Sequence, residues 1–302
     1  MEQLDAMKVF VRVAQLSSFT AAAESLRISK ASASGAVQYL EDTVGAQLLH
    51  RTTRRVRLTQ DGQVYFERCL DLLDDFDELQ AMFAPEATGL RGKLRVDMPL
   101  GVAQNVVLPR LSEFLDRHPN VEIEVSSTDR RVNIIEEGFD CVIRVGVLTD
   151  SSLMVKPIDH YQMMNCVSPS YVERYGMPTT IDDLKDHLLV HFVGTLGAKP
   201  LGFEYIDERG DVHEVSMRGL VTVNNSTSYL AACQAGLGII QVPRVGMRQR
   251  IAAGELVEVL PNYPSEPMPV VFVYPKRRHL PRRVQAFMAW ASDLLRKSIA
   301  ES

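Results

Sequence analysis

Cysteine is scarce in this 302-residue chain, and its four copies form no redox or metal motif. Cys69, Cys141, Cys166 and Cys233 lie too far apart for a CxxC pair, and they are too few for a disulfide scaffold. Uncharged apolar stretches of about 18 residues are also missing, and the N-terminus lacks the basic and apolar pattern of a signal peptide. We therefore expect a cytoplasmic protein in a reducing compartment, with no membrane partner.

Net positive charge, which many nucleic-acid-binding proteins carry, is also missing, because the formal net charge is −5. The charge is unevenly distributed along the chain. Residues 1–62 hold eight basic and six acidic side chains, and four of the eight basic ones lie at positions 51–57. Residues 63–88 hold one arginine and seven acidic residues. A phosphate-facing surface is therefore expected only near the N-terminus.

What the sequence does contain is typical of a folded globular protein, with 46% hydrophobic and 24% charged residues. At about 150 residues per domain, the length favours two domains or one domain with an appendage. After residue 89, strand-like segments alternate with helical ones, which predicts an α/β fold in one large domain or two lobes around a cleft. The expected strands are 93–98, 121–127, 140–145, 161–167, 188–193, 203–206, 212–217, 220–224, 237–242 and 269–274. The expected helices are 101–117, 129–137, 168–175, 181–186, 227–235, 243–252 and 281–299.

Short helices are predicted at the N-terminus. Apolar residues recur at helical spacing from Leu4 to Ala14, and an alanine-rich helix is expected at 19–26. Ser29 can cap a third helix, whose apolar residues share one face: Ala33, Ala36, Val37 and Leu40. The opposite face carries small and polar side chains, which suit a helix that enters a DNA major groove about 12 Å wide. The pattern is that of a helix-turn-helix.

A wing and a long helix are predicted next. Arginines alternate with Val56 and Leu58 in the segment 51–59, which favours a small hairpin with one face toward solvent or phosphate. Thr59 can cap a helix over 60–84, and residues 85–92 read as a hinge. One stripe of this helix is apolar at spacings of three and four: Tyr65, Cys69, Leu72, Phe76, Leu79 and Phe83. The stripe fits a two-helix seam, and packing against its own chain fits equally well.

These segments together resemble the LysR-type transcriptional regulators over nearly the whole chain. The strongest part of the likeness is the string FTAAAESL at 19–26, SKASAS at 29–34 and LLHRTTRRVRLTQDG at 48–62. Further support comes from GFDCVIRVG at 138–146, AGLGI at 235–239 and VYP at 273–275. The strand in 138–146 is similar to that of the effector-domain subgroup that contains IRxG.

The resemblance implies an α/β fold class with an N-terminal winged helix-turn-helix at 1–59, a dimerising linker helix at 60–88 and a two-lobed, periplasmic-binding-protein-like (type 2) effector domain at 89–302. Lobe 1 would comprise about 89–161 and 266–302, and lobe 2 about 162–265. The implied function is sequence-specific binding to double-stranded promoter DNA, modulated by a small-molecule effector. Implied partners are a second copy of the chain, as homodimer or homotetramer, and RNA polymerase. No cofactor is implied.

The residues expected to contact DNA lie in the helix-turn-helix and the wing: Thr20, Ser29, Lys30, Ala31, Ser32, Ser34, Gly35, Gln38, Arg51, Thr52, Arg54 and Arg55. Three of them depart from the commonest recognition-helix pattern of the family. Lys30 stands where Gln is frequent, Ala31 where Pro is frequent, and Gly35 where a long basic or amide side chain is common. The base preference and the phosphate contact at position 35 therefore need not follow the family.

Effector contacts are expected where two helices begin at the carboxyl ends of strands: Leu100, Gly101, Val102, Thr128, Arg144, Gly146, Asn225, Ser226 and Thr227. Free peptide N–H groups at such starts bind anions, so an organic acid or other small anion is the expected effector, provided that the two starts converge. Capping alone also explains the Asn/Ser run. Arg144 either faces the cleft or pairs with a carboxylate such as Asp140 or Asp150. Leu100 offers no hydroxyl, which favours a more apolar ligand body.

Signals for catalysis are weak, and we do not expect an enzyme. Neither a Gly-x-Ser-x-Gly motif nor a P-loop occurs. His187 and His191 have i, i+4 spacing, but the apolar residues between them read as a strand, so no metal is expected. Gly236 and Gly238 follow a helix and precede a strand, which favours a helix C-cap over a dinucleotide loop. The basic cluster at 276–283 reads as a solvated helix start. The alternative functions are a cytosolic small-molecule enzyme or a solute-binding protein of the α/β class.

Overall fold

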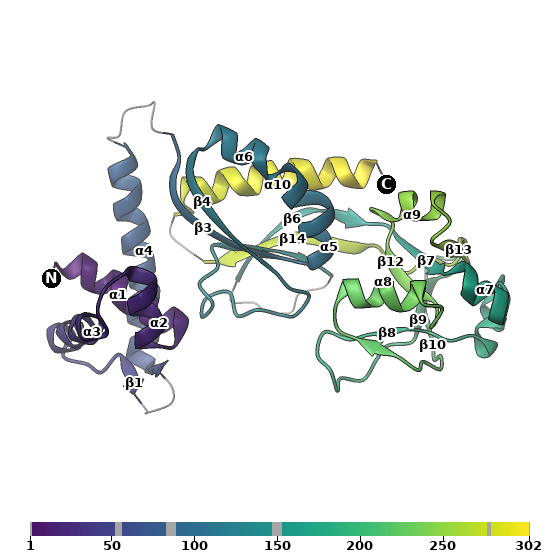
Figure 1. The fold of residues 1–302 in the computed structure, drawn as a ribbon, viewed down its shortest axis with the longest axis horizontal. Helices are drawn as coiled ribbons and strands as arrows, with labels where there is room; N and C mark the ends of the chain where they lie inside the picture. Colours follow the sequence, from purple (N-terminus) through teal and green to yellow (C-terminus); the bar gives the residue numbers. More distant parts are fainter. Residues whose placement is uncertain (1, 52–55, 83–88, 147–152, 277–278, 302) are drawn as a thin grey trace.

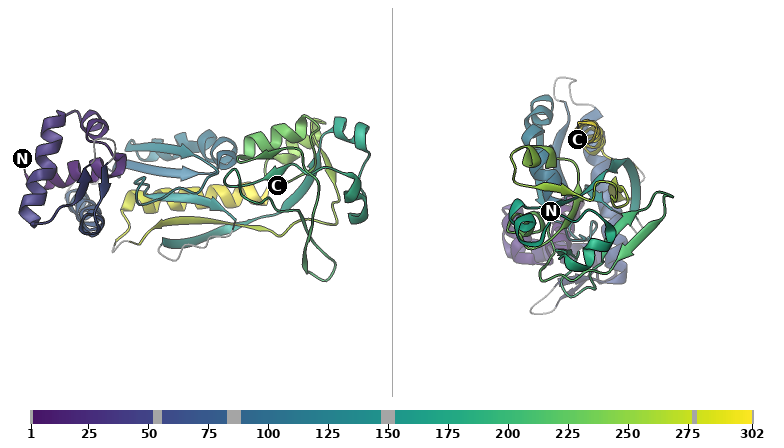
Figure 2. Two further views of the ribbon diagram at one scale, coloured as in Figure 1. Left: turned by 90° about the horizontal axis from the view of Figure 1, so that it is seen from below. Right: turned by 90° about the vertical axis from the view of Figure 1, so that its right-hand side faces the viewer.

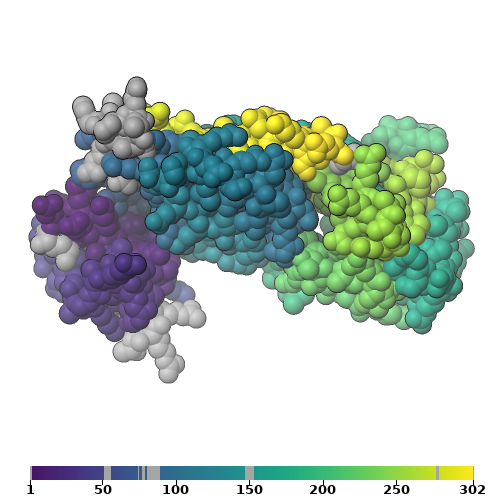
Figure 3. Space-filling view, turned by 45° about the horizontal axis from the view of Figure 1, so that its top comes forward, coloured from purple at the N-terminus to yellow at the C-terminus, as the bar shows by residue number. Residues whose placement is uncertain are grey.

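The computed structural model describes residues 2–51, 56–82, 89–146, 153–276 and 279–301. These residues form a helical N-terminal domain, a first α/β lobe and a second α/β lobe, which follow one another along the longest axis (Figures 1 and 2). In the space-filling view the three parts are in contact in that order (Figure 3). Within the described residues, no helix is both long enough and apolar enough to cross a membrane.

The N-terminal domain contains the helices that the sequence predicts: α1 (Gln3–Leu16), α2 (Phe19–Leu26) and α3 (Lys30–Val44). Serines start the second and third helices. Ser18 Oγ accepts the N–H of Ala21 at 3.2 Å, and Ser29 Oγ accepts that of Ser32 at 3.0 Å. Between these helices Arg27 adopts a left-handed conformation with φ of 56°, which ends α2 and makes the turn tight. The helix-turn-helix prediction is confirmed.

A wing and a long helix follow. The strands β1 (Leu49–Arg51) and β2 (Val56–Leu58) pair in antiparallel fashion. Thr59 Oγ1 then accepts the N–H of Gly62 at 2.8 Å and starts α4 (Gln60–Met82), as predicted. The predicted end of this helix at residue 84 lies outside the described residues.

Lobe 1 is built on a mixed sheet in the order β4-β3-β5-β14-β6. Its strands are β3 (Arg91–Met98), β4 (Asn120–Ser127), β5 (Cys141–Val145), β6 (Leu153–Tyr161) and β14 (Met268–Pro275). The sheet is covered by α10 (Arg282–Ala300) and by one helical run made of α5 (Leu100–Val102), the π-helical η2 (Ala103–Val107), η3 (Leu108–Arg110) and α6 (Leu111–Arg117). The apolar faces of these helices and the sheet enclose one hydrophobic core.

Lobe 2 centres on β7 (Met163–Val167), which lies between β12 (Ile240–Pro243) and β13 (Val257–Val259). Around this sheet lie α7 (Pro169–Tyr175), η4 (Ile181–Asp186), β8 (His191–Phe192), β9 (Phe203–Ile206), β10 (Val212–Val215), β11 (Thr222–Val223), α8 (Ser226–Gln234) and α9 (Met247–Ala252). The chain passes between the lobes after β6 and again before β14 (Figure 1). Of the two alternatives open at the sequence level, the two-lobed arrangement is the one observed.

The predicted helix at 129–137 is wrong, because this segment consists of bends and a turn. Its two isoleucines serve different cores. Ile134 is buried with Phe139 beside the lobe 1 sheet, whereas Ile135 packs against the core of the N-terminal domain. Asn133 Oδ1 accepts the N–H of Glu136, which closes a local turn instead of a helix.

Two strands were missed by the sequence analysis, β6 and β13. The strand β6 lies at the sheet edge, carries exposed side chains along most of its length, and contains Pro157 where its register against β14 shifts. Proline in a strand is tolerated at such an edge or bulge. Because most of the side chains are exposed, the alternation of apolar and polar residues that marks a strand is weak here. The strand β13 has only three residues.

Candidate functional site

The helix α3 has a buried face and an exposed face. Ala33, Ala36, Val37 and Leu40 are buried in the N-terminal core. Most of the predicted DNA contacts in the helix-turn-helix are exposed, and one is half-buried, Ser34; the exposed ones are Thr20, Ser29, Lys30, Ala31, Ser32, Gly35 and Gln38. The structure therefore brings these side chains to one accessible surface, held in place by the apolar residues behind it.

Two of these residues have local roles as well. Ser29 Oγ caps α3 and lies 2.8 Å from Ser32 Oγ, so both hydroxyls are already engaged with each other. At Gly35 a Cβ would meet nothing within 4 Å. The middle of the exposed face is therefore open, which allows a close approach of a DNA backbone.

The wing is fastened to α3 by Glu41. Its Oε1 accepts the N–H groups of Leu48 and Leu49 at 3.0 and 3.1 Å. No local sequence pattern points to this role of Glu41, because its two partners lie seven and eight residues further along the chain. Arg51 stands in β1 opposite Val56. The other predicted wing contacts, Thr52, Arg54 and Arg55, lie outside the described residues.

The two predicted helix starts converge between the lobes. The N–H of Leu100 in lobe 1 donates to Asp129 Oδ1 at 3.0 Å, and the N–H of Ser226 in lobe 2 donates to Asp129 Oδ2 at 2.6 Å. A Cβ on Gly101 would lie 3.9 Å from Ser226 Oγ, so the lobes approach closely here. Figure 1 shows α5 and α8 facing each other at this point. Asp129, which the sequence analysis did not single out, lies at the centre of the arrangement.

Arg144 forms an ion pair at the carboxyl end of β3. Its Nη2 lies 2.7 Å from Asp97 Oδ2, and the side chains of Arg144 and Asp97 are 12% and 0% exposed. The partner is therefore Asp97, and not Asp140, whose Oδ2 instead accepts the N–H of Arg95 at 2.8 Å. Asp150, the other partner considered, lies outside the described residues. Thr128 Oγ1 also reaches Asp97, at 3.3 Å, which connects the ion pair to the strand end that carries Asp129.

The remaining predicted effector contacts take different positions. Val102 is buried in the core of lobe 1, which directs its side chain away from lobe 2. Gly146 has φ of 98° and donates its N–H to Pro269 O. Asn225 Oδ1 caps α8 by accepting the N–H of Ser228 at 2.8 Å, and Thr227 is exposed in the first turn of that helix.

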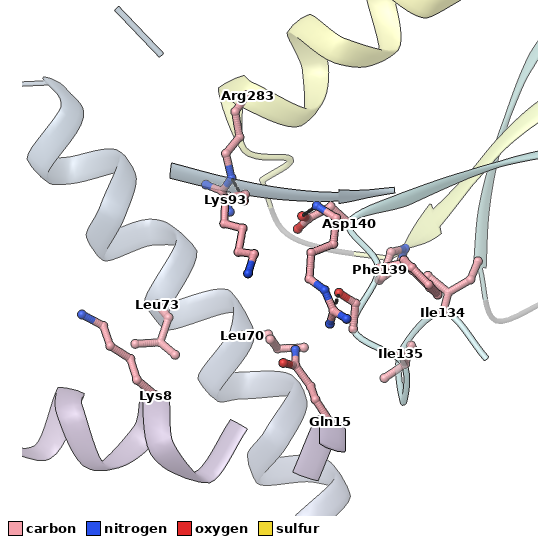
Figure 4. A pocket seen from close by; sticks show the side chains of 13 residues that line it. Lys8, Gln15, Leu70, Leu73, Lys93, Ile134, Ile135, Phe139, Asp140 and Arg283 are labelled. Carbon is pink, nitrogen blue, oxygen red and sulfur yellow. Dashed lines mark hydrogen bonds between the residues drawn. The ribbon is translucent and has the colours of Figure 1, made fainter. Parts of the chain in front are cut away.

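A cavity of about 280 Å³ lies between the N-terminal domain and lobe 1 (Figure 4). One wall is lined by side chains of α1 and α4, which include Lys8, Gln15, Leu70 and Leu73. The other wall belongs to lobe 1 and includes Lys93, Arg95, Asp140 and Arg283. Gln15 abuts Gly138, where a Cβ would lie 2.5 Å from Gln15 Nε2. Arg95 donates from Nη1 to Glu137 O and from Nε to Glu124. Because protein groups already accept the hydrogen bonds of this guanidinium, we interpret the cavity as a gap at the boundary between two domains.

The other signals singled out in the sequence take the following positions in the structure. His187 Nδ1 lies 3.0 Å from Tyr171 Oη, and His191 stands in β8. Gly236 has φ of 75° and follows α8, as a C-cap requires. In the basic cluster, Arg283 Nε donates to Lys93 O. Within the described part of the chain, no group of His, Cys, Asp and Glu side chains could hold a metal ion.

Two family models match the chain in the same order as these parts. The model for bacterial regulatory helix-turn-helix proteins of the lysR family matches residues 4–63, and the model for the LysR substrate binding domain matches residues 87–296. Together they cover both the exposed face of α3 and the interlobe contacts.

Similar proteins are found along the full length. The chain is 46% identical to the uncharacterized HTH-type transcriptional regulator YhjC of Escherichia coli, over 98% of this chain and 99% of the relative. It is 36% identical to an HTH-type transcriptional repressor of Pseudomonas aeruginosa, over 97% and 92%, and 32% identical to the HTH-type transcriptional activator AaeR of E. coli, over 97% and 94%.

Solved structures agree with the fold. The LysR-type regulator CrgA of Neisseria meningitidis matches with a TM-score of 0.59 and 27% identity, covering 96% of this chain and 97% of CrgA. The Vibrio cholerae virulence activator AphB matches with a TM-score of 0.58 and 26% identity, covering 96% and 98%. These relatives are regulators, so the alternative of an enzyme or a solute carrier is not favoured. The chain belongs to the LysR family of helix-turn-helix transcriptional regulators.

Proposed function

We propose that this regulator binds a specific sequence in double-stranded promoter DNA through α3 and the wing, as a homodimer or homotetramer, and that a small-molecule effector held between the lobes modulates the binding or its effect on RNA polymerase. The observation that carries the proposal is the exposed polar face of α3, from Lys30 to Gln38. The opposite, apolar face of the helix is buried in the N-terminal core. A helix held in this way can enter the major groove without unfolding.

The proposed contacts divide by chemistry. Lys30 and Gln38 can reach base edges, since a lysine donates to guanine and an amide pairs with adenine. Thr20, Ser34 and whichever hydroxyl of the Ser29–Ser32 pair keeps its proton free can donate to phosphate oxygens. Gly35 and Ala31 allow the backbone to come close. The arginines at 51, 54 and 55 supply positive charge for phosphate or for a narrow minor groove.

The test begins with genome-wide mapping of the DNA that the protein binds. On a mapped promoter, Lys30→Ala and Gln38→Ala should each lower the preference for one base pair by about 1–3 kcal/mol, whereas Arg54→Ala should weaken all sequences more evenly. Lys185→Ala, which removes an exposed lysine of lobe 2, is the matched control and should change neither quantity. Unchanged discrimination in both α3 variants would reject this assignment.

For the effector we propose a small organic acid or another small anion. The support is the convergence of the Leu100 and Ser226 N–H groups on one carboxylate, because donors that bind an aspartate side chain also suit a free carboxylate. The ligand body would lie near Leu100, Gly101, Thr128, Gly146 and the first turn of α8. Leu100 offers it an apolar surface.

The effector proposal is tested on the full-length protein with a panel of carboxylates chosen from the genes next to the mapped promoters. Calorimetry measures binding, and Ser226→Pro, which removes the donating N–H, should abolish it. Ser228→Pro is the matched control for damage to the helix, because it removes a different N–H, the one that Asn225 caps. This variant should still bind the carboxylate. In vitro transcription with RNA polymerase then measures the sign of regulation, for which the relatives include both a repressor and an activator.

A further inference from the structure

One carboxylate ties the two lobes together. Asp129 follows β4 of lobe 1, and its two oxygens accept peptide N–H groups on opposite sides of the interlobe boundary: Leu100 at 3.0 Å and Ser226 at 2.6 Å. Charge-assisted hydrogen bonds of this kind are stronger than those between neutral groups. The Ser226 N–H also stands at the start of the nine-residue helix α8, where the helix dipole favours a negative charge.

The surroundings show that this position suits an anion and that the protein fills it itself. Ser226 Oγ is buried and makes no hydrogen bond to any part of the chain that the structure describes, so it is an unused donor beside the carboxylate. Gly101 lies opposite this hydroxyl without a side chain. The Asn225 side chain accepts the N–H of Ser228, whereas the N–H of Ser226 is directed at Asp129.

We infer that Asp129 is an internal competitor for the effector, and therefore the residue that sets which ligands the cleft accepts. A carboxylate ligand gains the N–H groups of Leu100 and Ser226 only when Asp129 releases them, because each N–H has a single proton to donate. The inference rests on the proposed effector site between the lobes and adds its regulation. Without ligand, Asp129 holds lobe 2 to lobe 1; with ligand, the same donors hold the ligand and Asp129 turns to solvent.

Two consequences follow for ligand selection. A weak or monodentate anion cannot displace a tethered carboxylate, whose effective concentration is high. A successful effector must therefore bring further contacts, such as an apolar body against Leu100. Removing the Asp129 carboxylate should make the cleft accept even the simplest carboxylates.

The experiment is a chemical rescue on the full-length protein without DNA, with acetate and formate as probes and chloride at matched ionic strength as reference. Hydrogen exchange is followed at Leu100 and Ser226, together with the melting temperature. In Asp129→Ala, exchange at Ser226 should be roughly tenfold faster than in the wild type, which is the factor expected for a lost charge-assisted hydrogen bond. Acetate should slow this exchange again and raise the melting temperature, whereas the wild type should respond to acetate no more than to chloride.

Two further variants keep the test decisive. Asp129→Asn is nearly isosteric and retains one acceptor oxygen, so it should show part of the loss and a smaller rescue, even if Asp129→Ala folds poorly. Asp116→Ala removes an exposed carboxylate on α6 and should behave like the wild type. Equal acetate responses in the wild type and both Asp129 variants would overturn the inference, as would faster exchange without rescue or unchanged exchange at Ser226. Since no DNA is present, loss of promoter binding would reject the proposed function and leave this result standing.

Discussion

The start of α4 crosses the wing so closely that a Cβ on Gly62 would lie 1.9 Å from the carbonyl oxygen of Leu48. Gly62 also donates its N–H to Thr59 Oγ1, and the N–H of Thr59 in turn donates to Leu48 O at 3.0 Å. The contact fixes the position of α4 against the strand β1 and, through Glu41, against α3. The glycine at position 62 is therefore explained by packing.

Gly62→Ala should destabilise the N-terminal domain. The added methyl group overlaps backbone that cannot move without breaking the Thr59 and Leu48 contacts, and overpacking of this kind costs about 1–3 kcal/mol. Urea unfolding measures the effect. The control is Gly35→Ala, whose Cβ meets open space in the middle of α3 and should stabilise the domain by about 0.5–1 kcal/mol. If both variants were equally stable, the close crossing would be wrong.

Leu79→Asp should disrupt assembly without disrupting the fold. Leu72 and Leu79 lie one heptad apart on α4 and are 47% and 52% exposed in the single chain, whereas Cys69 on the same stripe is buried in the N-terminal core. The stripe thus packs against its own chain at Cys69, whereas Leu72 and Leu79 are accessible to a partner helix. An aspartate buried in such a seam costs several kcal/mol.

Sedimentation measures this prediction. The wild type should be a dimer or larger, and Leu79→Asp should sediment as a monomer with an unchanged circular dichroism spectrum. Leu201→Asp is the matched control, because Leu201 is 70% exposed in lobe 2 and lies outside the stripe. An intact oligomer in Leu79→Asp would exclude the seam.

The sequence predicts those elements whose pattern is local. Ser29 and Thr59 each start a helix as predicted, and each side chain accepts the N–H of the residue three positions further on, because capping depends only on residues that close in sequence. The prediction fails where a segment serves two partners. The pattern around Ile134 and Ile135 suggests a helix, but the two side chains pack into different cores. No single helical periodicity therefore describes the segment.

The interlobe site shows the same division. The sequence places helix starts at residues 101 and 227, each within one residue of the observed starts at Leu100 and Ser226. It does not identify Asp129, because the role of this carboxylate depends on donors 29 and 97 residues away along the chain. The pairing of Arg144 with Asp97 likewise depends on the parallel alignment of β3 and β5, which no local pattern encodes.

The Arg144–Asp97 ion pair should show strong coupling. Removing one partner leaves an unpaired charge in a buried position, so Arg144→Ala and Asp97→Ala should each lower the free energy of unfolding by about 3–5 kcal/mol. The double variant should lose less than the sum of the two, since neither charge remains. The exposed pair of Arg130 and Glu137 supplies the control, and Arg130→Ala should cost less than about 1 kcal/mol. Additive effects in the double variant would contradict the pairing.

His187 should make lobe 2 less stable in mildly acidic solution. Its side chain is buried, and its Nδ1 lies 3.0 Å from Tyr171 Oη. Tyr171 Oη already accepts the N–H of Leu188 at 2.8 Å, so its own proton is free to be donated to Nδ1 of a neutral imidazole. Burial lowers the pKa of His187 below its ordinary value, despite the opposing charges of Asp183 and Asp186.

The direction of the pH dependence follows from this lowered pKa. In the unfolded chain His187 binds a proton near pH 6.5, whereas in the folded protein it does so only at lower pH. The unfolded state therefore holds more protons between the two pKa values, and stability is full above about pH 6.5 and falls as the pH drops through this window. His187→Gln, which keeps an acceptor for Tyr171, should flatten that part of the curve. Burial also lowers the pKa of His118, so part of the pH dependence of stability remains in the variant. Urea unfolding from pH 8 to pH 5 measures the difference between the two proteins. Parallel curves for the wild type and His187→Gln would show that this histidine is not held neutral.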